Sequence, residues 1–278
     1  MPHTGYDARG GDIPPERYAV VSCHVERPLD DAVWEAFRRF QAGRPGGFRI
    51  AALVRPPDTA AAAGEAGAAR AAVWLERARF ASEHGPFGLH THFGGREHGR
   101  ARPGDPEPAD RVRAELATLA GHGLAPRFFC GGNWYLDERV AGVLAAAGLA
   151  DCTATAFTPR HLPADAARLA LAAPAWLRIA APGGAGPVPG VPGVPAPPAR
   201  LLELPTTHSL GMTARAALSP AAPRTLHCYF HDTDLVVPSR ARALAVALAV
   251  LGRRRRPLDL DELAGVMAST APEVCFGG

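Results

Sequence analysis

Two histidines stand two residues apart in the stretch GLHTHFGG, residues 88–95. On a β-strand, residues i and i+2 project from the same face, so His90 and His92 can point together toward one metal ion. Zinc binds imidazole nitrogens at about 2.0–2.1 Å, with each ring held in one orientation. The glycines that follow let the backbone turn away without crowding the site. Two polar residues that face solvent at a strand end would show the same spacing, so a metal site requires further ligands.

A carboxylate and a third histidine occur with the same spacing in SCHVERP, residues 22–28. If Val25 points outward, His24 and Glu26 both face inward. One carboxylate and two histidines, with an open position, form a ligand set for a catalytic Zn²⁺ or a similar divalent ion. The alternative for Glu26 is an exposed acid at the start of the helix expected near Pro28.

The stretch LHCYFHDTDLV, residues 226–236, holds two more histidines on one strand face. Four residues of strand separate them by about 13 Å at ~3.3 Å per residue, so both cannot serve one site. His231, at the C-terminal end of the strand, is the candidate for the site, and we expect His227 to be a hydrogen-bonded strand histidine. Asp232 and Asp234 are expected to cap the next helix or to orient the His231 ring.

These residues belong to an alternation of short apolar runs and amphipathic stretches. Strand candidates lie at 18–24, 47–54, 86–92, 126–132, 150–156, 200–207 and 224–231. Helix patterns lie at 29–43, 68–82, 106–122, 136–147, 238–252 and 259–269. The alternation favours parallel pairing through βαβ crossovers, and seven such units suffice for an incomplete α/β barrel. The C-terminal rim of such a barrel carries the active site, and the strand candidates place there His24, His90, His92, Cys130 and His231.

We expect a single domain over residues 18–270, after an N-terminal extension of residues 1–17. The stretch 181–198 is rich in proline and glycine and resembles a linker. Only two strand candidates follow it, and alone they would leave open sheet edges, so we place it inside the domain as a long loop. A long loop beside the rim is a candidate lid.

The composition is that of a globular protein. The 278 residues are 47% hydrophobic and 21% charged, with a net charge of +3. The run Arg253–Arg256 follows an apolar helix pattern, which indicates a solvated helix end rather than a nucleic-acid surface. The chain has neither an apolar run of about 18 residues nor a secretory pattern, so we expect a cytoplasmic protein without a membrane span. Five scattered cysteines without a C-x-x-C pair indicate reduced thiols.

Taken in order, these blocks resemble the NodB-type polysaccharide deacetylases, carbohydrate esterase family 4, and particularly their divergent bacterial members. The resemblance runs from about Tyr18 to about Ala264. It implies an α/β fold of the distorted (β/α)7 barrel type. The family's first motif, T-F-D-D-G, is similar to residues 22–26, which implies that Glu26 is a metal ligand and that His24 stands where the base does.

The family's second motif supplies two metal histidines, usually four residues apart. Its match here is His90 and His92, with His98 as a spare candidate. The third motif forms one wall of the substrate groove and is similar to residues 128–155, in which Cys130 stands where the family has an arginine.

The fifth motif, a strand that ends in Leu-His, resembles CYFHDTDL, which makes His231 the general acid. The fourth motif has no clear counterpart, and residues 202–209 are the region in which to seek it. Loss of the catalytic aspartate and of the groove arginine leaves open an altered reaction or a binding protein without turnover. Histidines on two strand ends favour retained chemistry.

The resemblance implies a metal-dependent hydrolase that removes an N-acyl group, in the first place acetyl, from an amino sugar or a related small intracellular substrate. The ion would be Zn²⁺, with Co²⁺, Ni²⁺ or Mn²⁺ as alternatives, bound by Glu26, His90 and His92. His24 would act as base on the metal-bound water. The exchanged assignment, with His24 as ligand and Glu26 as base, stays open.

His231 would protonate the leaving amine, and backbone amides near Gly131 and Gly132 would stabilise the oxyanion. Trp134 and Tyr135 would offer a flat wall for a sugar ring, or are ordinary core aromatics. The candidate substrate-binding residues are Cys130, Gly131, Gly132, Asn133, Trp134 and Tyr135. The alternatives are hydrolysis of another C–N bond, such as a formamide or a cyclic amide, and a non-catalytic carbohydrate-binding barrel. The expected partner is a sugar or another small molecule and not a nucleic acid.

Overall fold

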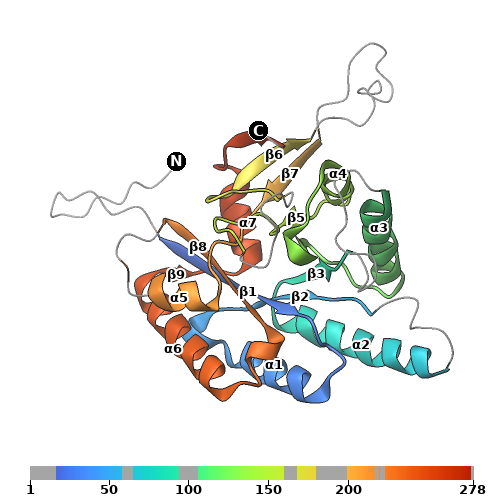
Figure 1. The fold of residues 1–278 in the computed structure, drawn as a ribbon, viewed down its shortest axis with the longest axis horizontal. Coiled ribbons are helices and arrows are strands. Elements are labelled where there is room, and N and C mark those ends of the chain that lie inside the picture. The colour runs from blue at the N-terminus through green and yellow to red at the C-terminus, as the bar shows by residue number, and fades with distance from the viewer. Residues whose placement is uncertain are drawn as a thin grey trace, which may run out of the picture.

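The computed structural model describes residues 17–57, 65–93, 106–159, 168–179, 199–216, 219 and 223–276, and within these ranges ten strands form one sheet (Figure 1). The strand order is β10-β6-β7-β5-β4-β3-β2-β1-β8, with β9 beside β1. The described pairs are parallel except β6 with β7. The strands are β1 (Tyr18–Val25), β2 (Ala51–Val54), β3 (Phe87–Thr91), β4 (Phe128–Gly131), β5 (Ala150–Asp151), β6 (Ala175–Ile179), β7 (Ala199–Glu203), β8 (Thr225–His231), β9 (Arg256–Pro257) and β10 (Glu273–Cys275).

Helices connect most of the parallel strands and pack on the sheet (Figure 1). They are α1 (Asp31–Gly43), α2 (Glu65–His84), α3 (Pro106–Gly121), α4 (Glu138–Ala146), α5 (Leu210–Ala216), α6 (Pro238–Arg254) and α7 (Leu260–Ala268), with 3-10 turns η1 (Pro45–Gly47), η3 (Gly132–Trp134) and η4 (Asp232–Asp234). None of the described helices is long and apolar enough to cross a bilayer.

The alternation of side chains along β1 divides the core in two. Ala19, Val21 and Cys23 pack in a large cluster with residues of α1, α2 and α6, whereas Tyr18 and Val20 pack in a smaller cluster with residues of α7. By the same alternation, the next inward positions after Val20 are Ser22 and His24. The strand therefore delivers its polar residues to the face that α7 covers.

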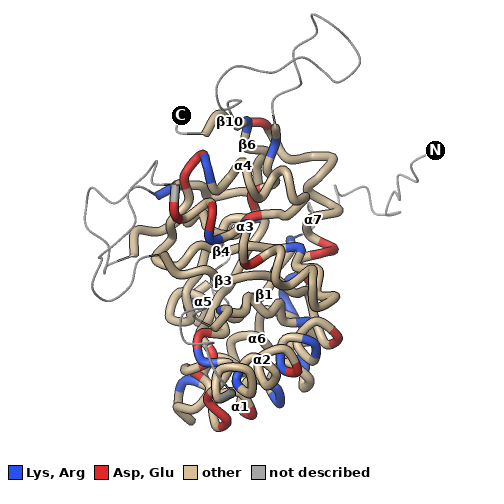
Figure 2. Tube along the Cα trace, turned by 90° about the vertical axis from the view of Figure 1, so that its right-hand side faces the viewer, with Lys and Arg blue, Asp and Glu red and all other residues tan. Residues whose placement is uncertain are grey.

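Charged residues are frequent on the outer helices. Figure 2 shows basic and acidic residues interspersed around α1 and α2. Ion pairs such as Arg38 with Glu35 and Arg77 with Asp31 join them locally.

The predicted fold class is confirmed: the chain is a single α/β domain with a central, mainly parallel sheet and flanking helices, and its arrangement is barrel-like. Among the described residues, the end strands β10 and β8 are not hydrogen-bonded to each other. The seven predicted strands correspond to β1, β2, β3, β4, β5, β7 and β8. The sequence did not indicate β6, β9, β10 or α5. Most of the expected N-terminal extension, the stretch 181–198 and His98 lie outside the described residues.

Candidate metal centre

The residues expected at the rim do meet at the carboxyl ends of four strands. His24 lies near the end of β1, directly opposite His231, the last residue of β8. His90 of β3 lies opposite Cys130 of β4. Neighbouring parallel strands end at the same edge of the sheet, so four segments far apart in the sequence bring their polar side chains together.

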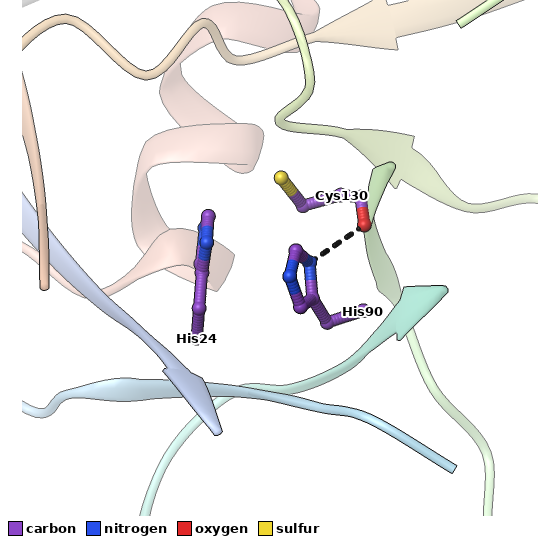
Figure 3. A group of neighbouring side chains, drawn as sticks. All are labelled: His24, His90 and Cys130. Carbon is purple, nitrogen blue, oxygen red and sulfur yellow. Dashed lines mark hydrogen bonds between the residues drawn. The ribbon is translucent and has the colours of Figure 1, made fainter. Parts of the chain in front are cut away.

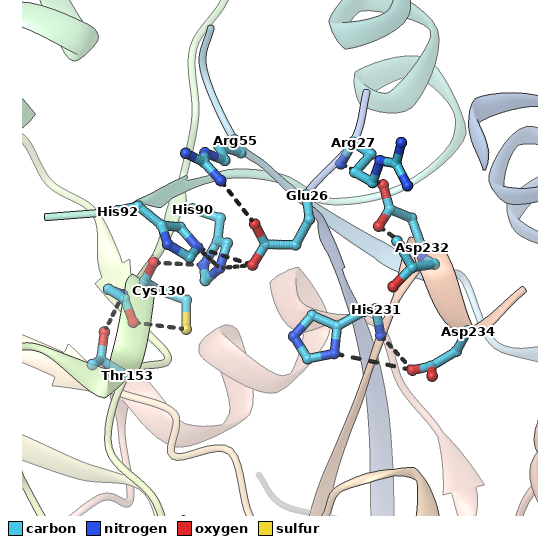
Figure 4. Close-up of polar contacts among 12 residues, drawn as sticks. Glu26, Arg27, Arg55, His90, His92, Cys130, Thr153, His231, Asp232 and Asp234 are labelled. Atoms are coloured by element: carbon cyan, nitrogen blue, oxygen red, sulfur yellow. Dashed lines mark hydrogen bonds and ion pairs between the residues drawn. The ribbon is translucent and has the colours of Figure 1, made fainter. Parts of the chain in front are cut away.

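Glu26, His90 and His92 form a compact group, which we call the outer triad (Figure 4). Glu26 Oε1 lies 2.9 Å from the Nε2 atoms of both His90 and His92, and these two nitrogens lie 3.1 Å apart. Ligands at about 2.0–2.1 Å around a tetrahedral ion are separated by about 3.3 Å, close to this triangle. The side chains of Glu26 and His92 are 18% and 26% exposed, so one side of the group is open to solvent.

The hydrogen bonds of His90 fix the direction of its lone pair. Nδ1 lies 3.0 Å from the carbonyl oxygen of Cys130, which can only accept, so Nδ1 carries the hydrogen. A singly protonated ring with its hydrogen on Nδ1 presents the Nε2 lone pair toward the Glu26 carboxylate, which also offers only lone pairs. A cation between the two atoms would resolve this opposition, and the donor set of two imidazoles and one carboxylate suits Zn²⁺.

The Glu26 carboxyl is ionised in this setting. Burial would raise its pKa, but the contacts with the His90 and His92 rings lower the pKa far below the usual range of a glutamate. The Arg55 guanidinium lies 3.5 Å from Oε2, the other carboxylate oxygen of Glu26. The group therefore offers a negative charge to a cation.

Gly132 makes room for His92. A Cβ atom at position 132 would lie 2.7 Å from both Cγ and Cδ2 of the His92 ring, which is closer than real Cβ contacts. The absence of a side chain at Gly132 therefore allows the ring to reach Glu26.

His24 is buried against His90 and carries an unsatisfied atom. The two rings stack with centroids 4.3 Å apart. Among the described residues, no partner hydrogen-bonds the buried His24 Nε2. Burial, and then the neighbouring His90 and His231, lower the pKa of His24 well below its usual value, so the ring is neutral at pH 7. A buried polar atom without a partner in a native fold points to a missing ligand or to a catalytic role.

His24 also belongs to a second group with His90 and Cys130, which we call the inner triad (Figure 3). One potential ligand atom from each residue lies within 4.8 Å of the other two. The inner and outer triads share His90 and remain separate groups.

His231 lies at the solvent-exposed side of the site. Its ring meets the His24 ring edge-on at 5.4 Å, and its side chain is 40% exposed. Burial lowers its pKa below the usual value. Its backbone N–H donates to Asp234 at 3.0 Å, and Asp232 accepts from the backbone N–H of Arg27 at 2.8 Å. Asp234 thus closes the η4 turn, and Asp232 ties the end of β8 to the segment after β1. Neither aspartate caps the next helix, because α6 begins without a side-chain cap.

Aromatic rings line the histidines. The Tyr229 ring lies 4.9 Å from that of His24, and the Trp134 ring lies 5.7 Å from it. Phe157 stacks parallel to Tyr229 at 6.2 Å, with Trp134 edge-on to both. The sequence singled out Trp134 but neither Tyr229 nor Phe157, although Tyr229 shares a strand face with His231.

Two of the expected substrate-binding residues are occupied elsewhere. Tyr135 is buried, its hydroxyl donates to Asp137 at 3.0 Å, and its ring packs on Phe93. The Gly131 N–H donates to Thr153 Oγ1 at 2.7 Å, so it is not available to an oxyanion. Asn133 lies exposed in η3 with a left-handed φ of 54°.

His227 is the hydrogen-bonded strand histidine that the sequence predicts. Nδ1 lies 3.0 Å from the Leu204 carbonyl, and Nε2 lies 2.9 Å from Ser22 Oγ. The ring therefore donates to the carbonyl and accepts from the serine. It joins β1 and β8 beneath the site.

A buried pair of carboxyl groups, Asp151 and Glu203, lies behind Cys130. The two residues are paired in the register of β5 and β7. Burial raises the pKa of both, and that of Glu203 more strongly, so the pair retains a proton. Asp151 accepts from Thr153, which holds Gly131. Burial and then these two carboxyls raise the pKa of Cys130.

The chain matches no family model and no curated protein. Among solved structures, it is similar to a Bordetella bronchiseptica protein assigned as a polysaccharide deacetylase involved in O-antigen biosynthesis, with 13% identity and a TM-score of 0.43 over 92% of this chain and 91% of that chain. It is also similar to 4-alpha-glucanotransferase from Thermococcus litoralis, with 10% identity and a TM-score of 0.47 over 93% of this chain and 40% of that chain. The first is of the type that the sequence resemblance names.

Proposed function

We propose that the protein is a metal-dependent hydrolase that removes an N-acyl group, in the first place acetyl, from an amino sugar or a related small molecule. The observation that carries the proposal is the outer triad, in which three potential ligand atoms lie 2.9–3.1 Å apart. A catalytic zinc site typically has three such protein ligands and an open side.

Glu26, His90 and His92 would hold the ion. Zn²⁺ fits this donor set best, and Co²⁺, Ni²⁺ and Mn²⁺ accept the same ligands. When bound, a divalent ion polarises the substrate carbonyl and lowers the pKa of a water toward ~7.

His24 and His231 supply the proton transfers. His24 is neutral, and its buried Nε2 is unpaired among the described residues, so it has no competing partner when it takes a proton from the attacking water. His231 lies beside it and is more exposed, so it is placed to deliver a proton to the departing amine. Tetrahedral collapse then releases acid and amine.

The aromatic residues bind the substrate. The half-buried Tyr229 and Phe157 rings, packed on the buried Trp134, form an apolar surface beside the catalytic histidines. The C–H face of a pyranose ring is apolar and packs on such surfaces, whereas its hydroxyls stay solvated. This supports a sugar rather than a charged peptide as substrate.

The test is release of free acid from a panel of N-acetyl and N-formyl amino sugars and cyclic amides, with zinc-loaded and chelator-treated full-length protein. We expect acid release from at least one N-acetyl sugar, lost on chelation and reduced by about 10²–10⁴ in His231→Ala. His122→Ala, at an exposed histidine outside the site, is the matched control. Activity confined to formamides or cyclic amides would replace the acetyl assignment, and acid release that survives chelation would contradict the metal-dependent reaction.

A further inference from the structure

The inner triad offers a donor set different from that of the outer triad. Its residues are His24, His90 and Cys130, all at most 3% exposed. Two imidazoles and a thiolate form a soft ligand set, whereas the carboxylate of the outer triad is a hard ligand. Sulfur ligands select ions that form strong metal–sulfur bonds.

An independent observation points to a ligand at this position. His24 Nε2 is buried and lacks a hydrogen-bond partner among the described residues. The ring is fixed by packing against His90 and Tyr229, so the orphan nitrogen is not free to turn toward solvent. Figure 3 shows the Cys130 sulfur directed toward the side on which His24 lies.

Among the described residues, the Cys130 sulfur interacts with the neutral Thr153 side chain and the Gly131 carbonyl. Its described hydrogen bond to the Gly131 carbonyl is long, at 3.9 Å. The carboxyl groups of Glu26, Asp151 and Glu203 are near enough to act electrostatically on Cys130. A cation placed beside the sulfur would therefore be favoured by its surroundings.

We propose that His24, His90 and Cys130 form a second metal position, selective for soft, thiophilic divalent ions such as Cd²⁺. Binding breaks the Cys130 S–H bond, forms a metal–sulfur bond and releases the proton to solvent. Because Nδ1 of His90 is engaged with the Cys130 carbonyl, both triads need the same His90 Nε2. Only one triad is filled at a time, and a soft ion in the inner triad withdraws His90 from the outer one.

The test is a Cd²⁺ titration of the metal-free, full-length protein, followed by the thiolate-to-cadmium charge-transfer band in the ultraviolet. The band should saturate at one equivalent and be lost in Cys130→Ser. It should persist in Cys152→Ser, a matched control, because Cys152 is equally buried but belongs to neither triad. It should also persist in His92→Ala, which removes only an outer ligand. A wild-type protein without the band, or a band that survives in Cys130→Ser, overturns the proposal.

A second measurement does not depend on the folding of a variant. X-ray absorption at the cadmium edge of the wild-type complex should show one sulfur neighbour among lighter atoms, and a shell of nitrogen and oxygen alone overturns the inner position. The inference rests on the proposed function only through the shared His90. If the band appears but no amide is hydrolysed, the hydrolase proposal fails and the inner position stands. If amides are hydrolysed but the band is absent, the reverse holds.

Discussion

At the scale of single residues, the direction of lone pairs determines what the site can do. His90 donates through Nδ1 to a backbone carbonyl, which leaves Nε2 for an ion. The sequence predicted the clustering of His90, His92 and Glu26, because strand parity places alternate residues on one face. It did not indicate a ligand role for Cys130, since a lone cysteine has no spacing pattern. Nor did it show that Gly131 is engaged with Thr153, because that contact depends on two neighbouring strands.

Substitution of Gly132 should disturb the metal site without touching a ligand. In Gly132→Ala, the new Cβ would meet the His92 ring at 2.7 Å, so the ring must move away from Glu26. We expect zinc affinity to fall by about 10–100-fold, as when other supports of metal ligands are lost. Competition with a chromophoric chelator measures this. Gly142→Ala in α4 is the control, since its Cβ would meet nothing within 4 Å; equal affinities in both variants would refute the role of Gly132.

The roles of His24 and Glu26 can be separated by comparing metal content with turnover. His24→Ala leaves the outer triad intact, so it should keep its zinc while kcat falls by about 10²–10⁴. Glu26→Gln removes the ionised ligand, so it should lose zinc as well as activity. Elemental analysis and kcat on the same preparations decide the matter. Zinc loss in His24→Ala with zinc retained in Glu26→Gln would support the exchanged assignment.

At the scale of elements, the helices predicted at 29–43 and 259–269 formed, because local side-chain caps stabilise their first turns. Asp30 accepts from the Val33 N–H at the start of α1, and Asp259 forms a capping box with Glu262 at the start of α7. Strand β6 was not predicted because it is stabilised by its pairing with other strands. It pairs antiparallel with β7 and parallel with β10, near the C-terminus. Such distant partners leave no local pattern.

The β1–β8 pair should make stability depend on pH through His227. Burial lowers the pKa of His227 to about 4, against about 6.5 in an unfolded chain. Between pH ~6.5 and ~4, His227 is protonated in the unfolded chain but not in the folded protein. The contribution of neutral His227 to the free energy of unfolding is therefore complete above pH ~6.5 and is lost as pH falls toward ~4. The difference between the folded and unfolded pKa values of His227 corresponds to about 3 kcal/mol of unfolding free energy.

Urea unfolding at pH 7, 6, 5 and 4 measures this dependence. The free energy of unfolding should fall with decreasing pH in the wild-type protein and fall less steeply in His227→Gln. His122→Ala, at an exposed histidine, should keep the wild-type slope. Identical slopes in wild type and His227→Gln would rule out His227 as a source of the dependence.

At the scale of the whole molecule, strand order decides which distant residues meet. Asp151 and Glu203 become neighbours because β7 lies directly beside β5. The class of fold followed from the alternation of strands and helices, and so did the edge that carries the site. The contact between Asp151 and Glu203 could not be predicted, because the sequence alone does not specify that β7 rather than β6 pairs with β5.

We propose that the carboxyl edge of this sheet is a metal centre. The most direct measurement is elemental analysis of full-length protein purified without chelator and dialysed against zinc. The wild-type protein and His122→Ala should hold about one equivalent of zinc, because the three outer ligands have the spacing that such an ion needs. The double variant His90→Ala/His92→Ala should hold none. A folded wild-type protein that binds no zinc, or a double variant that binds as much as the wild type, would rule out a metal centre formed by the outer triad.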